Sequence, residues 1–335
     1  MPAVCVAGIL FFVACKHSGG KVLEVAYVSG VEVNLRNRVA AAYEKAGVVK
    51  NGDRVEVLDH DRRFAKVRTA TGQMGWMEQR YLVSQQVFDQ LQKLTADNSN
   101  DPVQAQGTTR NDTNLHVEPG RETEHLYQIL SGEKLALLKR GTAEKPGVMA
   151  APAKAGASGE KKEAMPVLED WWLVRDSHGR VGWVLGRMVD TDVPLEVAQY
   201  AEGQRIVAFF VLNQVQDEDK KVAQYLIVLT EPKDGLPFDF NQFRVFTWNV
   251  KRHRYETAYR ERGEGMLPVK VSQEDFGKEG TLPVFTIRVL DDNGNVSERK
   301  YKLNTPMVRR VYAPGEEPMH AVSKKTPTRK ARKRR

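Results

Sequence analysis

The chain repeats part of itself, and this internal repeat constrains its fold more than any other feature. Asn34-Leu35 and Gly52 recur 80 residues later, and Gly72 and Gly75-Trp76 recur 107 residues later. The two spacings differ by 27 residues, so the second copy carries an insertion in one loop. One folding unit is therefore written twice, and the pattern favours a binding module over a catalytic domain.

Each copy has the pattern of short β-strands separated by glycine turns. In the first copy, apolar and polar residues alternate over residues 31–35, 54–58 and 64–68, and Thr71-Gly72 follows as a turn. Alternation with a period of two is the pattern of a strand that is buried on one face. About five such strands in about 55 residues are typical of a small β-barrel.

These motifs resemble the bacterial SH3-like domain, which runs from an Asn-Leu-Arg segment through an aromatic strand and a glycine turn to a closing Gly-Trp. Both copies, residues 30–84 and 108–190, carry this pattern, as Asn34-Leu35-Arg36 with Gly75-Trp76 and as Asn114-Leu115-His116 with Gly182-Trp183. The resemblance implies two small barrels that bind cell-wall peptidoglycan or short peptides through an aromatic-lined groove.

Two features depart from the family pattern. Arg36-Asn37-Arg38-Val39 stands where Arg-Ser-Gly-Pro is usual, in a loop that borders the ligand groove in the family. The insertion, residues 141–168, is rich in Ala, Gly, Lys and Pro and has no apolar period. We therefore expect it to be a disordered excursion from a hairpin loop.

The candidate ligand-binding residues are the large aromatic side chains of the two copies. They are Tyr43, Phe64, Trp76 and Tyr81 in the first copy, and Tyr127, Trp171, Trp172 and Trp183 in the second. A small barrel also needs large aromatics to fill its core, so most of these positions are expected to be core. Adjacent strand residues face opposite ways, so we expect one ring of Trp171-Trp172 to be exposed or packed against a neighbour.

The N-terminus has the pattern of an export signal. Residues 3–15 are uncharged and mostly apolar, which is shorter than the ~20 residues that a membrane-spanning helix needs. The segment before Cys15 resembles a bacterial lipoprotein box, so residues 1–15 are expected to be a signal peptide and Cys15 the site of lipid attachment. An ordinary secretory signal and a buried N-terminal strand in a cytoplasmic protein remain open.

Charge and cysteine content limit the possible chemistry. The net charge is +8, but the last twelve residues hold eight basic side chains, and without them 43 basic residues face 43 acidic ones. Cys5 and Cys15 are the two cysteines, so the body of the chain has no thiol nucleophile or thiolate metal site. Phosphate-loop, paired-His and nucleophile-elbow motifs are missing as well. We therefore expect no enzyme, no cofactor and no metal, with an Asp/Glu glycosidase left open.

The rest of the chain is expected to hold two connectors and a third domain. Residues 85–101 are predicted to be a helix with a linker, and residues 194–204 a second short helix. Seven or eight strands are expected over residues 205–312, as an all-β sandwich or barrel, with Asn293-Gly294 turning one hairpin. The predicted fold is thus mainly β: two SH3-like barrels, helical connectors and a third all-β domain.

A basic and aromatic cluster lies within the third domain at residues 248–255. Arg252 and Arg254 are candidates for binding an anionic glycan or an acidic peptide, because guanidinium groups fork onto carboxylates. The alternative is a hairpin whose basic tip is simply solvated. His253 has no evident acidic partner in the sequence, so we do not predict a catalytic role for it.

Together these features favour a non-enzymatic lipoprotein on the periplasmic side of the cell envelope. Its tandem modules would bind peptidoglycan or peptide segments of partner proteins, each weakly, with affinity gained through linkage. The basic tail, residues 313–335, is expected to be disordered and to attract polyanions. The alternative is a cytoplasmic nucleic-acid-binding protein that uses this tail, which a neutral body and an export signal disfavour.

Overall fold

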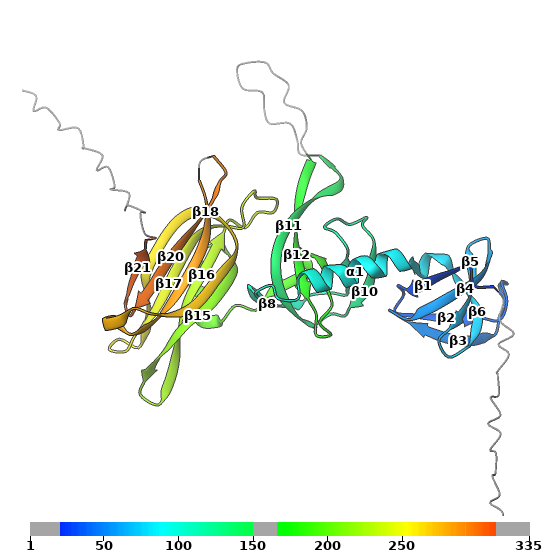
Figure 1. Cartoon of the computed structure of the whole chain (residues 1–335), viewed down its shortest axis with the longest axis horizontal. Helices are drawn as coiled ribbons and strands as arrows, with labels where there is room; N and C mark the ends of the chain where they lie inside the picture. The colour runs from blue at the N-terminus through cyan, green and yellow to red at the C-terminus, as the bar shows by residue number, and fades with distance from the viewer. Residues whose placement is uncertain (1–20, 150–165, 292, 313–335) are drawn as a thin grey trace, which may run out of the picture. The chain divides into compact units, whose positions relative to one another are not determined.

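The computed structural model describes residues 21–149, 166–291 and 293–312. The chain is mainly β and forms three antiparallel sheets of seven strands each (Figure 1). It divides into two compact units, one built around the first sheet and the other containing the third sheet and most of the second. The predicted signal peptide, the lipid site at Cys15 and the basic tail lie outside the described residues.

The first sheet follows from the alternation of its strands. Its strands pair in the order β3-β2-β6-β5-β4-β1-β7. Their bounds are β1 (Glu24–Val28), β2 (Glu32–Arg36), β3 (Lys45–Lys50), β4 (Arg54–Asp61), β5 (Phe64–Thr69), β6 (Met74–Glu78) and β7 (Leu82–Ser84). The inward positions of these strands, such as Leu35, Val57 and Val67, are fully buried and make one core cluster.

The second sheet has the same strand order as the first, with each strand replaced by its counterpart: β10-β9-β13-β12-β11-β8-β14. Its strands are β8 (Ala105–Thr109), β9 (Thr113–His116), β10 (His125–Ile129), β11 (Lys134–Met149), β12 (Pro166–Arg175), β13 (Val181–Leu185) and β14 (Val189–Thr191). The turn glycines also match, since Gly52 and Gly132 have φ of 84° and 86°, and Gly72 and Gly179 have φ of 84° and 79°. Positive φ is a conformation that glycine adopts without steric cost.

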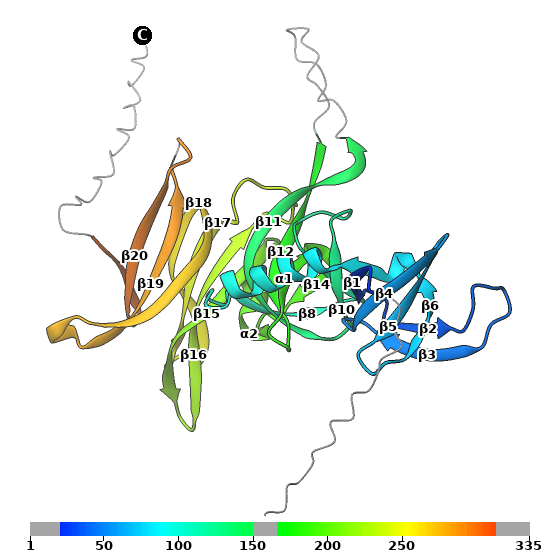
Figure 2. The same cartoon turned by 45° about the vertical axis from the view of Figure 1, so that its right-hand side comes forward.

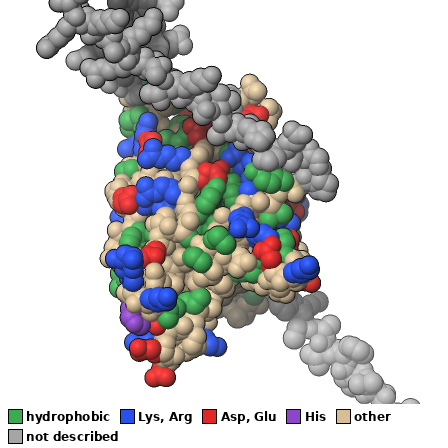
Figure 3. Space-filling view, turned by 90° about the vertical axis from the view of Figure 1, so that its left-hand side faces the viewer, with side chains coloured by type: hydrophobic (Ala, Val, Ile, Leu, Met, Phe, Trp, Pro, Cys, Tyr) green, Lys and Arg blue, Asp and Glu red, His purple; other side chains and the backbone are tan. Residues whose placement is uncertain are grey.

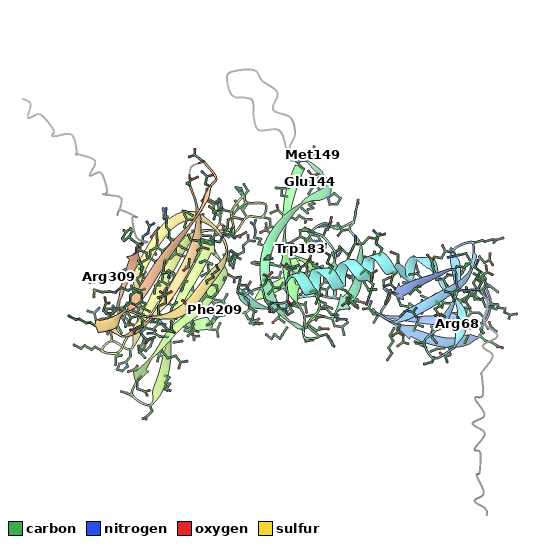
Figure 4. All side chains as sticks on the ribbon, in the orientation of Figure 1. Arg68, Glu144, Met149, Trp183, Phe209 and Arg309 are labelled. Carbon is green, nitrogen blue, oxygen red and sulfur yellow. The ribbon has the colours of Figure 1, made fainter. Side chains whose placement is uncertain are left out.

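The central hairpin of the second sheet corrects the expectation of a disordered insertion at residues 141–168. Strands β11 and β12 stay paired beyond the length of their counterparts, with Gly141 opposite Trp171 and Met149 opposite Pro166. Figure 2 shows this hairpin extending from the sheet, and Glu144 and Met149 are marked on it in Figure 4. Backbone pairing thus extends into a segment whose composition suggested a loop, and residues 150–165 lie outside the described residues.

The third sheet is a meander in which each strand pairs with the next along the chain. All seven strands belong to one sheet, so the two-sheet sandwich, one of the two expected arrangements, is not formed. Its strands are β15 (Arg205–Asp217), β16 (Lys220–Thr230), β17 (Phe240–Asn249), β18 (Arg254–Asp275), β19 (Thr281–Leu290), β20 (Val296–Asn304) and β21 (Met307–Val311). The predicted hairpin turn at Asn293-Gly294 is present, with Gly294 at a φ of 80°.

Strand β18 continues through a segment in which the sequence pattern suggests a turn. Gly263-Glu264-Gly265 suggests a turn, yet these residues lie within the strand. A Cβ on Gly265 would lie 2.2 Å from the Phe240 ring and 2.7 Å from the carbonyl oxygen of Arg288. Gly265 is therefore required for close packing between strands and not for a turn.

Two helices connect the sheets. Helix α1 (Gln85–Asp97) buries Val87 and Leu91, and the Phe88 ring stacks on Tyr27 with centroids 4.1 Å apart. Helix α2 (Leu195–Ala198) is a single turn that continues as a 3-10 turn, and its Val197 is fully buried. Among the described residues, no helix combines the length and apolar character that crossing a membrane requires.

Candidate functional site

A groove with aromatic and basic walls opens on the first sheet, between the β2–β3 loop and the β4–β5 turn. Its volume is about 390 Å³. The residues that line it are Arg36, Val39, Ala40, Ala41, Arg62, Arg63 and Phe64. We call it the arginine groove. No acidic side chain is among these lining residues, so its surface is basic and apolar.

Local hydrogen bonds shape both rims of the arginine groove. The β2–β3 loop is closed by Asn37 and Glu44, because the Glu44 amide donates to Asn37 Oδ1 at 3.0 Å and the Asn37 amide donates to the Glu44 carbonyl at 3.0 Å. The other rim is a two-residue turn, Arg62-Arg63, between β4 and β5. Arg62 has a φ of 52°, which is unusual for a residue other than glycine.

Arg36 forms the back of the arginine groove and is held in place on several sides. Its guanidinium lies 4.2 Å from the Tyr43 ring centroid and 4.9 Å from that of Phe64. Glu78 forms an ion pair with it, with Nη2 and Oε1 3.6 Å apart. Strand β6 approaches closely because residue 75 is glycine: a Cβ there would lie 2.7 Å from the Cβ of Leu35.

Arg62 and Arg63 supply positive charge that the protein itself does not neutralise. Both residues are exposed, and within the described part of the chain neither forms an ion pair. The Arg63 guanidinium lies 5.3 Å from the Phe64 ring centroid. A planar guanidinium presents a fork of donors that matches carboxylate and phosphate groups. The groove therefore has the chemistry of a site for an anion with an apolar stem.

The structure brings only some of the predicted aromatic residues to this groove. Phe64 lines it and is buried, and Tyr43 is exposed beside it, in contact with Arg36. Trp76 is half-buried, and its backbone lies opposite Arg36 in the pairing of β2 with β6. Tyr81 does not line the groove; Arg80 lies over its ring at 4.7 Å. The two arginines of the turn were missed by sequence reasoning, although a basic pair between two alternating strands is a visible signal.

In the second sheet, three predicted ligand-binding residues are buried. Tyr127, Trp171 and Trp172 are 8%, 2% and 9% exposed. Neither ring of Trp171-Trp172 is exposed, so of the two expected alternatives the exposed ring is corrected and the ring packed against a neighbour stays a prediction. Trp172 shares its strand face with Asp170, because residues two apart point the same way, and Asp170 contacts the segment around Gly235. Trp183 is half-buried and covers Gly141, where a Cβ would lie 2.9 Å from its ring.

Carboxylates take the place of the arginine pair in the second sheet, where Glu169 and Asp170 precede Trp171 as Arg62 and Arg63 precede Phe64. Glu169 accepts hydrogen bonds from Arg121 of the β9–β10 loop, with Nε and Oε2 2.7 Å apart. This pairing lowers the pKa of Glu169 below its ordinary value, against a smaller opposing effect of burial.

Asp170 is the centre of a buried ionic cluster that joins the second and third sheets. The side chains of Asp170 and Arg140 are 5% and 6% exposed, with Oδ1 and Nη2 2.6 Å apart. Arg205 Nη2 donates to the other oxygen at 2.8 Å, and the Gly235 amide donates at 2.8 Å. Burial disfavours the ionised form, but these donors outweigh it and lower the pKa of Asp170. Asp239 also contacts Arg140, yet its deeper burial raises its pKa.

The predicted basic cluster at the β17–β18 turn is internally paired. Arg252 and Arg254 both contact Glu256, at 3.2 and 3.3 Å. His253, which the sequence left without an acidic partner, lies 2.9 Å from Asp217. Hydrogen bonding to Asp217 raises the pKa of His253 above its ordinary value. The side of the molecule that lies to the left in Figure 1 carries Lys and Arg side chains interspersed with Asp and Glu (Figure 3).

The described residues contain no group of three or more His, Cys, Asp or Glu side chains arranged to hold a metal. Comparison with known families identifies a bacterial SH3 domain at residues 29–83, the part of the chain that holds the arginine groove. No curated protein matches the sequence.

Among solved structures, the chain is similar to NlpC2 and NlpC1 from Trichomonas vaginalis and to an NlpC/P60 family protein from Bacillus cereus. For NlpC2 the identity is 10%, over 86% of this chain and 95% of that one, with a TM-score of 0.18. For NlpC1 the identity is 10%, over 90% and 96%, with a TM-score of 0.19. For the Bacillus protein the identity is 11%, over 87% and 100%, with a TM-score of 0.23.

This comparison also bears on the expected class of protein. The prediction that the chain is not an enzyme is contradicted by its likeness to NlpC/P60 proteins, and it is withdrawn. Identities of 10–11% and TM-scores below 0.25 assign no residue of this chain to a catalytic role.

Proposed function

We propose that the chain is a cell-envelope protein whose bacterial SH3 domain binds a peptide of the cell wall, or of a partner protein, in the arginine groove. The observation that carries this proposal is the groove itself. It combines the Phe64 ring, with Tyr43 beside the groove, and two exposed arginines that have no acidic partner in the described residues. A peptide offers both an apolar stem and a charged group to such a surface.

The second sheet would be a second SH3-like domain with a different task. Its identical strand order and matching turn glycines support this assignment. The arginine pair of the first copy, Arg62 and Arg63, is replaced there by Glu169 and Asp170, which are already paired within the chain. Its contribution would therefore be to hold the third sheet, while the first copy binds the ligand.

The location outside the cytoplasm rests on the N-terminal sequence and on the family of the first domain. A lipid on Cys15 would hold the protein at a membrane, because each buried methylene contributes roughly 0.8 kcal/mol. The basic tail would add a salt-sensitive attraction to polyanions. Mass spectrometry of the mature N-terminus tests the location: an acylated Cys15 supports it, and an intact Met1 in the cytosol contradicts it.

Sedimentation with purified cell-wall sacculi tests the ligand. The wild-type chain is expected to sediment, and the variant Arg62→Asn with Arg63→Gln to stay largely in the supernatant. Arg80→Gln is the matched control, because Arg80 is an exposed arginine of the same domain that contacts Glu78 and Tyr81 outside the groove. If the wild type does not sediment, a cell-wall ligand is excluded and peptide segments of proteins become the candidates.

A further inference from the structure

We infer that the arginine groove recognises a carboxylate group of an acidic peptide, bound by Arg62 and Arg63. This inference rests on the proposed function and adds the chemistry of the ligand. The carboxylate belongs to a Glu or Asp side chain or to a peptide C-terminus, which present the same group to a guanidinium.

The first support is the balance of charge around the groove. Arg36 is partly neutralised by Glu78, 3.6 Å away, and Glu78 is itself shared with Arg80, whose Nε lies 2.9 Å from it. The described residues provide no such partner for Arg62 or Arg63. The groove therefore holds more positive than negative charge, and an anion is the ligand that would balance it.

The second support is the corresponding place in the second sheet. There Arg121 of the β9–β10 loop binds Glu169 through two of its nitrogens. Counted along the repeat, the loop position of Arg121 corresponds to Ala41, and Glu169 corresponds to Arg62. One copy thus contains a complete guanidinium–carboxylate pair across this gap. The other copy has a small side chain on one rim and an arginine on the other, which leaves room for a carboxylate from outside.

The third support decides between a peptide and a nucleic acid. Single-stranded nucleic acid is bound largely by stacking of bases on aromatic faces. In this groove Arg36 already lies over the rings of both Tyr43 and Phe64. The remaining surface at Val39, Ala40 and Ala41 is small and aliphatic, and it suits the methylene stem of an acidic residue.

Titration of the full chain with short peptides, followed by calorimetry, tests the inference. One peptide carries a central Glu and blocked ends, one carries a free C-terminus and no acidic side chain, and one carries Gln with blocked ends. We expect at least one of the first two peptides to bind about tenfold or more tighter than the Gln peptide. A hydrogen bond to a charged group contributes enough free energy for a change in affinity of this size. Which of the two binds tighter identifies the source of the carboxylate.

The variants locate the binding. The double variant Arg62→Asn with Arg63→Gln should lower the affinity of the chain for the acidic peptide about ten- to hundredfold. Arg80→Gln should leave this affinity unchanged. Asparagine tolerates the positive φ at residue 62, so the turn is retained, and circular dichroism checks that the variant is folded. Equal binding of the Glu, free C-terminus and Gln peptides would overturn the inference. So would tighter binding of inorganic phosphate or of a single-stranded oligonucleotide.

The outcomes separate this inference from the proposed function. If sacculi bind the chain but the peptides show no preference for a carboxylate, the inference fails and the cell-wall proposal stands. If acidic peptides bind in the groove while sacculi do not, the inference stands and the cell-wall ligand is excluded.

Discussion

The first and second sheets share one strand order, but they use the hairpin at their centre in opposite ways. In the first, β4 and β5 are joined by the exposed pair Arg62-Arg63, beside an open groove. In the second, the hairpin is longer, and Glu169 and Asp170 occupy the corresponding place and are buried. A few side chains at one hairpin therefore decide whether this topology leaves its charged groups exposed or pairs them within the chain.

The difference also has an energetic side. An exposed charge in water costs little free energy, whereas a buried charge must be paired. Asp170 is buried and satisfied by Arg140, Arg205 and the Gly235 amide, so its removal would break two ion pairs and one backbone hydrogen bond. Arg63, the corresponding residue of the first copy, is exposed and forms no ion pair within the described residues, so the stability of the fold does not depend on its charge.

The largest effect is expected at the buried joint. Asp170→Ala should lower the free energy of unfolding by about 3–5 kcal/mol, because buried Arg140 loses its partner at 2.6 Å and keeps only Asp239, which is 3.3 Å away and has a raised pKa. Arg63→Ala, at the corresponding position of the first copy, should change it by less than ~0.5 kcal/mol. Urea unfolding of the full chain, followed by tryptophan fluorescence, measures both. Equal losses in the two variants would remove the contrast between site and joint.

A smaller effect is expected at the rim pair of the second copy. Glu169→Gln should destabilise the chain by about 1–2 kcal/mol, because Glu169 is mostly buried and accepts two hydrogen bonds from Arg121. Asp190→Asn is the control, since the pair of Asp190 with Arg110 is exposed and should contribute less than ~1 kcal/mol. A Glu169→Gln variant as stable as wild type would show that the second copy does not need its internal carboxylate.

The turns at Gly72 and Gly179 have the same backbone conformation, so the same substitution should reduce stability equally in the two copies. Gly72→Ala and Gly179→Ala each force a Cβ into a positive φ and should each cost about 1–2 kcal/mol. A Cβ would meet nothing within 4 Å at either position, so the cost is that of the backbone alone. Asparagine at the same positions should cost less than alanine, because it tolerates positive φ. A large difference between the two alanine variants would mean that the turns are not equivalent.

The smallest effect is on the dependence of stability on pH. The folded-state pKa of Glu169 is lowered, mainly by the hydrogen bond from Arg121. Its stabilisation is therefore complete above the unfolded pKa of about 4.3 and is lost as the pH falls through the folded pKa. The stability difference between wild type and Glu169→Gln should shrink between pH 7 and pH 3 in urea unfolding. A difference that is unchanged over this range would assign the effect of Glu169 to packing.

Local features of the fold could be read from the sequence. Alternation located most strands. The glycines between the strands indicated turns, because a positive φ is a local preference of glycine, and Gly52, Gly72, Gly132 and Gly179 all have positive φ. Features that depend on distant partners could not be read in this way. The sequence around Gly265 suggests a turn, because the reason for this glycine is the Phe240 ring on another strand. His253 was left without a partner because Asp217 is 36 residues away.

The candidate site shows the same division. The sequence pointed to aromatic residues, and two of these, Phe64 and Tyr43, lie in and beside the arginine groove. It also included Trp171 and Trp172, which are buried. It did not include Arg62 and Arg63, because an exposed basic pair at a turn is ordinary until its neighbours are known.

The sequence alone determined the duplicated strand pattern, the turns and the mainly β character, since each follows from the preferences of a residue and its immediate neighbours. The tertiary structure decided which copy leaves the charges of its central hairpin exposed and which pairs them within the chain. That outcome depends on the burial of Asp170 and on its contacts with Arg205 and Gly235. Burial and pairing across a long stretch of chain arise only when the sheets pack, because they are properties of the assembled core and not of any short segment.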